Sequence, residues 1–143
     1  MGAHNRTPTA EDASHLLRFL PGFEDRDEPI ATWEGGSYDE TTRVITLAYP
    51  NYAADVIEFF HSLHQPPWLH FDYMSDRTRD LVADIEKMNT ATLEEIKAVL
   101  TWCARGERFC DGHWISVLEG GVVQGALHRL AALFPDAANS PNL

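Results

Sequence analysis

The stretch TLEEIKAVLTWCAR, residues 92–105, decides the fold class that we predict for this chain. Thr92 and Glu95 have the spacing of a capping box, in which each side chain accepts a hydrogen bond from the other residue's backbone amide. Apolar residues recur within the stretch at the helical period, at positions 93, 96, 100 and 103. The stretch therefore predicts an amphipathic helix with one buried face, and Gly106 is placed to end it.

Comparable signals on both sides of this stretch predict further helices. Residues that can cap a helix precede several segments of apolar periodicity, namely Thr9, Asn51, Ser75 and Asp111. Breaker pairs such as Pro21-Gly22 and Gly120-Gly121 are placed to end such segments. We expect helices at about 9–20, 51–64, 75–88, 111–120 and 123–134.

Two segments in the N-terminal half have the composition of strands instead. Residues 30–34 and 43–49 are rich in β-branched and aromatic side chains, and Gly35-Gly36 and polar residues lie between them. Because a two-stranded hairpin is only marginally stable by itself, we expect this pair to pack on the helices. The predicted fold class is mainly α with a small β-hairpin (α+β), a compact bundle of about five or six helices.

The length of 143 residues is typical of one domain, so we expect a single globular domain over 10–135 with flexible tails at 1–9 and 136–143. The sequence has no apolar run long enough to span a membrane, and its polar N-terminus lacks the apolar core of a secretion signal. The two cysteines, Cys103 and Cys110, are too few for a disulfide framework and are expected to be reduced. These features predict a cytoplasmic location.

Acidic residues outnumber basic residues 22 to 11, which gives a formal net charge of −11 with neutral histidines. Direct nucleic-acid binding would need a surplus of lysine and arginine, so this balance argues against it. The balance argues equally against docking on an anionic membrane surface. It leaves one alternative open, an acidic decoy that occupies the basic site of a nucleic-acid-binding protein.

The densest polar stretch is RGERFCDGHW, residues 105–114. A cysteine so close to a histidine suggests nucleophilic catalysis, since an imidazole can hold a neighbouring thiol as thiolate. In that hypothesis Cys110 is the nucleophile, His113 is the base and Asp111 orients the imidazole.

The favoured interpretation of the same stretch is structural. Asp111 would cap a helix, and Arg105, Glu107 and Arg108 would form ion pairs that fix the turn. Cys110 and Trp114 would then be core residues, with His113 hydrogen-bonded.

A second polar cluster consists of His61, His64, His70 and Asp72, whose side chains are of the types that bind zinc or iron. The first two histidines are three residues apart and would share one face of a helix. No established metal-binding motif accompanies them. We therefore expect histidines stabilised by the end of a helix dipole, with no metal and no cofactor.

Aromatic residues collect in the predicted hairpin and in the loops, at Trp33, Tyr38, Tyr49, Tyr52, Trp68, Phe71 and Tyr73. Such residues either seal a core or form a pocket or a partner surface. We favour the core interpretation because a small domain needs the apolar area. If they are exposed instead, the candidates for a partner surface are Trp33, Trp68 and Tyr73.

Residues 100–114, LTWCARGERFCDGHW, are followed by Leu118-Glu-Gly-Gly121 and Leu127-His-Arg-Leu130. Together with Phe71-Asp72-Tyr73 and the stretch from Trp33 to Pro50, they resemble a bacterial family of unknown function, number 6508 among the domains of unknown function. The resemblance spans most of residues 15–134 and implies that Arg105 to His113 is the family signature. It implies no reaction, cofactor or catalytic residue. The histidines of the second cluster are not part of the pattern, which weakens the metal hypothesis further.

The absence of a catalytic signature favours a non-enzymatic domain that binds a protein partner or a second copy of itself. The binding candidates are Trp33, Trp68, Tyr73, Arg105, Glu107 and Arg108. The first alternative is a small hydrolase or transferase that uses Cys110 and His113. The second alternative is the acidic decoy.

Overall fold

The computed structural model describes residues 6–138, which contain eight α-helices, two 3-10 helices and four short strands. The α-helices are α1 (Ala10–Leu17), α2 (Leu20–Glu24), α3 (Ala54–Ser62), α4 (Asp76–Ala83), α5 (Leu93–Arg105), α6 (His113–Glu119), α7 (Val122–Leu133) and α8 (Pro135–Ala138). The 3-10 helices are η2 (Ile85–Thr90) and η3 (Gly106–Arg108), and the strands are β1 (Ala31–Glu34), β2 (Tyr38–Asp39), β3 (Val44–Ile45) and β4 (Tyr49–Tyr52). The predicted class, mainly α with a small β-hairpin, is confirmed.

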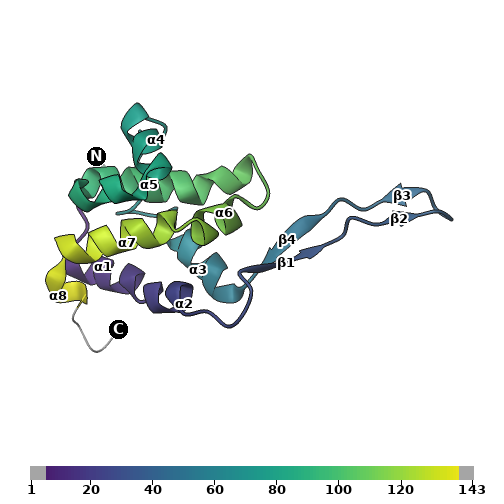
Figure 1. Cartoon of the computed structure of the whole chain (residues 1–143), viewed down its shortest axis with the longest axis horizontal. Coiled ribbons are helices and arrows are strands. Elements are labelled where there is room, and N and C mark those ends of the chain that lie inside the picture. The colour runs from purple at the N-terminus through teal and green to yellow at the C-terminus, as the bar shows by residue number, and fades with distance from the viewer. Residues whose placement is uncertain (1–5, 139–143) are drawn as a thin grey trace.

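Helix α5 runs through the helical bundle and contacts α4, α6 and α7 (Figure 1). Its capping box forms as predicted. The Thr92 amide donates to Glu95 Oε1 at 2.8 Å, and the Glu95 amide donates to Thr92 Oγ1 at 3.2 Å. The apolar face of the helix is fully buried at Ile96, Val99 and Leu100. Local capping and apolar periodicity therefore both favour this helix.

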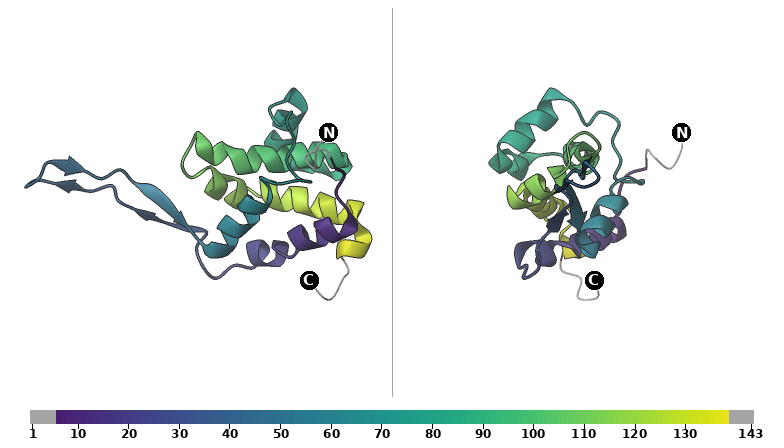
Figure 2. Two further views of the ribbon diagram at one scale, coloured as in Figure 1. Left: turned by 180° about the vertical axis from the view of Figure 1, so that it is seen from behind. Right: turned by 90° about the vertical axis from the view of Figure 1, so that its right-hand side faces the viewer.

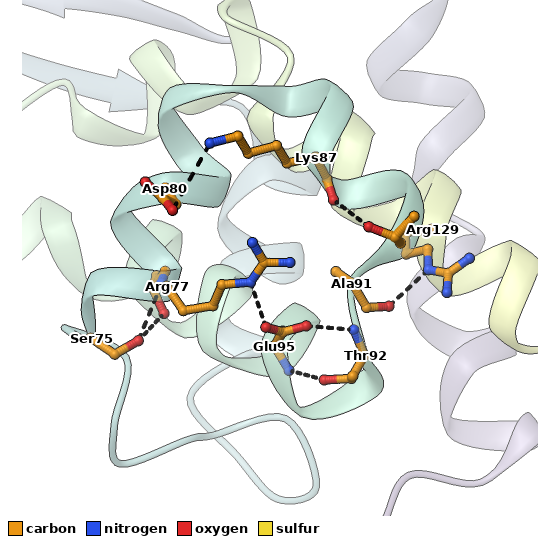
Figure 3. A network of polar contacts seen from close by, with 10 residues as sticks. Ser75, Arg77, Asp80, Lys87, Ala91, Thr92, Glu95 and Arg129 are labelled. Carbon is orange, nitrogen blue, oxygen red and sulfur yellow. Dashed lines mark hydrogen bonds and ion pairs between the residues drawn. The ribbon is translucent and has the colours of Figure 1, made fainter.

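Polar contacts fix the start of α5 against its neighbours (Figure 3). The Arg77 guanidinium of α4 pairs with the Glu95 carboxylate of α5. From α7, Arg129 donates to the Ala91 carbonyl at 2.8 Å. These contacts tie α4 to α5, and the residue before the N-cap of α5 to α7.

The core is a single cluster of buried apolar residues that extends from Ala13 in α1 to Ala137 in α8. Helices from both ends of the chain meet in it, since α1 contacts both α7 and α8 (Figure 2). Phe59 of α3 is fully buried, with its ring centroid 5.0 Å from Phe23 and 5.1 Å from Phe60. Both contacts are edge-to-face, the arrangement that aromatic quadrupoles favour.

The four strands form one long hairpin that projects from the helices, and we call residues 31–52 the arm (Figures 1 and 2). Strand β1 pairs antiparallel with β4 near the helices, and β2 pairs with β3 near the tip. Between the two pairs, the Thr46 amide donates to the Ser37 carbonyl at 2.8 Å. Only Ala31, Pro50 and Tyr52 of the arm are even partly buried. The expectation that the hairpin packs on the helices therefore holds only at the base of the arm, and the rest of the hairpin lies in solvent.

The backbone of the arm requires glycine at a place where the two sides of the hairpin lie close together. Gly35 and Gly36 have φ angles of 80° and 76°, in the left-handed region. A Cβ at Gly35 would lie 2.4 Å from the Leu47 carbonyl oxygen. A larger residue there would push apart the two sides of the hairpin.

Several predicted helix boundaries differ in the structure. The first helix ends at Leu17, and Pro21-Gly22 lies inside α2, because proline is tolerated in the first turn of a helix. Asn51 belongs to β4, and α3 starts after Ala53 without a side-chain cap. The helix predicted to reach residue 88 stops earlier, and Asp84 caps the separate helix η2.

Some residues of the two predicted tails lie within the described range. Thr9 caps α1 as expected, and Arg6 pairs with Asp12. Residues 136–138 belong to α8, and Ala137 is buried. The other residues of the two predicted tails, 1–5 and 139–143, lie outside the described range. Within residues 6–138, no helix has the length and apolar character needed to cross a membrane.

Candidate functional site

The arm presents an apolar surface to solvent. Its large exposed aliphatic side chains are Val44, Ile45 and Leu47, which are 56%, 68% and 79% exposed. Trp33, Tyr38 and Tyr49 of the arm are each at least half exposed. The prediction that these three aromatics are core residues is therefore wrong. Neighbouring exposed apolar residues of this kind are typical of interaction surfaces.

Sequence reasoning identified Trp33 but missed the aliphatic residues of the arm. The signal that could have found them is the segment VITLAY, residues 44–49, which carries no charged residue. Its β-branched residues were assigned to a buried strand. Periodicity cannot distinguish a strand that faces a core from one that faces a partner.

A stack of aromatic rings joins the base of the arm to the helices. The Tyr52 ring of β4 lies 4.9 Å from the Trp114 ring of α6, which stacks at 4.5 Å on Phe60 of α3. Burial and the neighbouring Glu107 carboxylate raise the pKa of Tyr52. On β1, the Trp33 ring leans on Gly112, where a Cβ would lie 3.2 Å from that ring. The arm is therefore anchored on the turn that precedes α6.

That turn is held by Glu107, which accepts two backbone hydrogen bonds. The amides of Gly112 and Trp114 each donate to its carboxylate at 2.9 Å. Gly112, with φ of 91°, is the N-cap residue of α6, so the prediction that Asp111 caps this helix is wrong. In the described chain, no ion pair joins Glu107 to Arg105 or to another residue. The turn is fixed by charge-to-backbone hydrogen bonds rather than by the expected ion pairs.

Cys110 and His113 are close in sequence but have different environments. Cys110 is exposed, contrary to the expectation of a core thiol, and its Sγ lies 3.8 Å from the Asp111 carbonyl oxygen. The His113 ring packs edge-on against Trp102 at 4.7 Å. Its Nε2 is buried against Gly106, with no hydrogen-bond partner among the described residues. Burial lowers the pKa of His113 and favours its neutral form.

The other predicted binding residues fall into three environments. The Arg105 guanidinium lies over the Tyr73 ring, 5.4 Å from its centroid, so these two candidates are brought together. Trp68 is 4% exposed and belongs to the core, as the core interpretation predicted. Arg108 is exposed and lies over the neighbouring Phe109 ring at 5.8 Å.

The candidate metal ligands are dispersed among separate contacts. His61 is exposed, and Nδ1 of His64 lies 2.9 Å from the Phe60 carbonyl oxygen. His70 Nε2 lies 3.3 Å from Glu94, and its Nδ1 accepts from the Asp72 amide. Within residues 6–138, no group of three or more histidine, cysteine or acidic side chains is arranged to hold a metal ion.

The geometry defines a class of protein, a small helical domain from which a β-hairpin arm projects. The base of the arm packs on a turn that the Glu107 carboxylate holds through two backbone amides. A family model described as a family of unknown function (DUF6508) matches residues 8–136. The chain belongs to this family, as the sequence resemblance implied. The match includes both the arm and the stretch from Arg105 to His113. Comparison with curated proteins and with solved structures gave no match.

Proposed function

We propose that this protein is a non-enzymatic, self-associating interaction module that pairs its arm with the arm of a second copy. One observation carries the proposal. The arm places an apolar row and two unpaired strand edges in solvent, with no described element packed over them. We treat residues 10–135 as the folded unit that carries this arm.

The physical argument begins with the stability of the arm. A hairpin of two strands is marginally stable in water unless further strands or a helix cover its apolar face. Each open strand edge also presents free backbone donors and acceptors to another strand. Pairing two arms edge to edge would form a four-stranded sheet, satisfy one edge of each hairpin and bring apolar side chains of adjacent strands into contact.

A second copy suits this surface better than a strongly charged partner would. Residues 44–49 carry no charge, so the same segment from two copies can meet across a twofold axis without bringing like charges together there. The rest of each chain carries the net charge of −11, which opposes non-specific contact elsewhere. Association would thus be confined to the uncharged part of the arm.

The alternatives have less support. For a hydrolase or transferase, the base nitrogen would have to be accessible, yet His113 Nε2 is buried against Gly106. A decoy of a basic protein would use carboxylates, and it would leave unexplained the apolar side chains Ile45 and Leu47, which are 68% and 79% exposed. Salt dependence separates these cases, because added salt should strengthen pairing between two acidic copies and weaken binding to a basic partner.

The test is the mass of the purified protein in solution. We expect light scattering coupled to gel filtration to give twice the chain mass of 16.1 kDa at high protein concentration. The double variant Ile45→Asp/Leu47→Asp should elute as a monomer with an unchanged helical circular dichroism spectrum. Met74→Asp, at a residue that is 55% exposed outside the arm, is the matched control and should remain a dimer.

Two outcomes would overturn self-pairing. One is a wild-type protein that stays monomeric up to sub-millimolar concentration. The other is a dimer that the double variant forms equally well. A monomer whose arm captures a different protein would keep the interaction role but reject the second copy as its occupant.

A further inference from the structure

A cavity of about 480 Å³ lies between α5 and the loop of residues 69–73. Its lining residues are Leu69, His70, Phe71, Tyr73, Glu94, Lys97 and Arg105. This volume is in the range of pockets that hold small organic ligands. The arm contributes no residue to the cavity, so it is distinct from the proposed self-association surface.

The sequence builds the cavity from a polar stripe on α5. Glu94, Lys97, Thr101 and Arg105 recur at spacings of three and four residues and share one face of the helix. Thr101 fixes the loop on this face, since its Oγ1 accepts from the His70 amide at 3.0 Å and lies 3.3 Å from the Trp68 carbonyl oxygen. The loop is therefore held over the helix with a cation on each side of Thr101.

The first cation is Lys97, whose side chain is only 4% exposed. Its Nζ lies 3.5 Å from Glu94 Oε2, and the same carboxylate oxygen lies 3.3 Å from His70 Nε2. Glu94 itself is 59% exposed. A buried ammonium therefore shares a single, largely solvated carboxylate with an imidazole, which is incomplete compensation for its burial.

The second cation is Arg105, which has no carboxylate within ion-pair distance in the described chain. Its Nε is buried and lacks a hydrogen-bond partner there. The Tyr73 ring holds the guanidinium by a cation–π contact at 5.4 Å. A planar guanidinium with free donors is well suited to bind a carboxylate or a phosphate through two oxygens.

The rim of the cavity supplies a flat apolar surface. Phe71 is 90% exposed, and its ring stacks on the His70 ring at 5.6 Å with an interplanar angle of 4°. An exposed aromatic ring beside the mouth of the cavity can stack with the flat ring of a ligand.

We propose that this cavity binds a small organic anion in which a carboxylate or phosphate is attached to a flat ring system. The anionic group lies in the part of the cavity that Lys97 and Arg105 line, and the ring lies against Phe71. Two basic side chains and one carboxylate line the cavity, within a chain of net charge −11.

The test uses isothermal titration calorimetry with matched probes. 2-Naphthoate and 1-naphthyl phosphate carry the two anionic groups on the same ring, and 2-naphthalenemethanol is the neutral counterpart. Inorganic phosphate and acetate lack the ring. We expect one anionic naphthalene probe to bind at least about tenfold more tightly than the neutral probe and than the free anions, and the two probes distinguish carboxylate from phosphate.

Variants separate the two parts of the site. Lys97→Met and Arg105→Met should each weaken binding of the preferred probe about tenfold, and Phe71→Ala should weaken the ring contribution alone. Arg108→Met is the matched control, because Arg108 is an exposed cation that does not line the cavity. Glu94→Gln removes the carboxylate that competes for Lys97 and should tighten binding several-fold.

If Lys97→Met does not fold because Lys97 is buried, Glu94→Gln and Phe71→Ala still decide the test. The Glu94 and Phe71 side chains are largely exposed, so their replacement should leave the fold intact. Equal binding of the neutral and anionic probes would overturn the proposal. So would binding that Glu94→Gln weakens, or an absence of binding by both anionic probes at millimolar concentration.

Discussion

Replacement of Glu107 by alanine tests how the turn before α6 is held. The carboxylate accepts hydrogen bonds from the Gly112 and Trp114 amides, each at 2.9 Å, and both bonds are partly buried. A hydrogen bond to a charged group contributes roughly 1.5–3 kcal/mol, and partial exposure places these two at the lower end. The expected loss on Glu107→Ala is therefore about 3 kcal/mol of unfolding free energy.

The assay is urea unfolding followed by circular dichroism of the helices. With a slope of about 2 kcal/mol per molar urea for a chain of this size, the midpoint should fall by roughly 1.5 M. Glu107→Gln keeps an acceptor oxygen but loses the charge, so its midpoint should fall about half as far. Arg108→Ala, at an exposed neighbouring residue, should change the midpoint by less than about 0.3 M.

The reasoning fails if Glu107→Ala shifts the midpoint no more than Arg108→Ala does. That result would mean that the two amides are equally well satisfied by water and that the turn is held by the packing of Trp114 alone. If Glu107→Gln lowers the midpoint as far as Glu107→Ala does, the charge of the carboxylate stabilises the turn, and a neutral acceptor oxygen at this position contributes nothing.

Three further predictions concern the bundle. Thr92→Ala should lower the unfolding free energy by about 1 kcal/mol in urea titration, because it removes the N-cap acceptor of α5. Ellman's reagent should titrate one thiol per native chain, Cys110, and a second only after unfolding, since Cys103 is fully buried and burial raises the pKa of that thiol. Below pH 6.5 the protein should lose stability, because burial lowers the pKa of His113 and the unfolded chain binds its proton first. His113→Phe should flatten the dependence of the urea midpoint on pH between about 7.5 and about 5.5.

The features that could be predicted from the sequence are those that neighbouring residues determine. Thr9, Ser75 and Thr92 cap helices as predicted, because a cap is a contact between residues three positions apart. The apolar stripe of α5 was also correct, because its periodicity directly reflects which face is buried.

The features that could not be predicted depend on contacts between distant residues or on the absence of such contacts. The apolar segment 44–49 has the composition of a buried strand, and only the tertiary structure places it in solvent. Asp111 has the residue type of a cap, but Glu107 performs that role from several positions away. The α5 cavity requires the loop around Phe71 to cross the helix, which no local pattern specifies.

The turn and the arm belong to one structural unit, and this bears on the interpretation of the polar stretch from Arg105 to His113. Glu107 fixes the amide of Trp114, and the Trp114 ring packs on Tyr52 at the base of the arm. It also fixes Gly112, on which the Trp33 ring leans from the other strand. Because both strands are anchored on groups that one carboxylate positions, the charged turn sets the direction in which the arm projects. Support of the arm then accounts for Glu107 in this polar stretch.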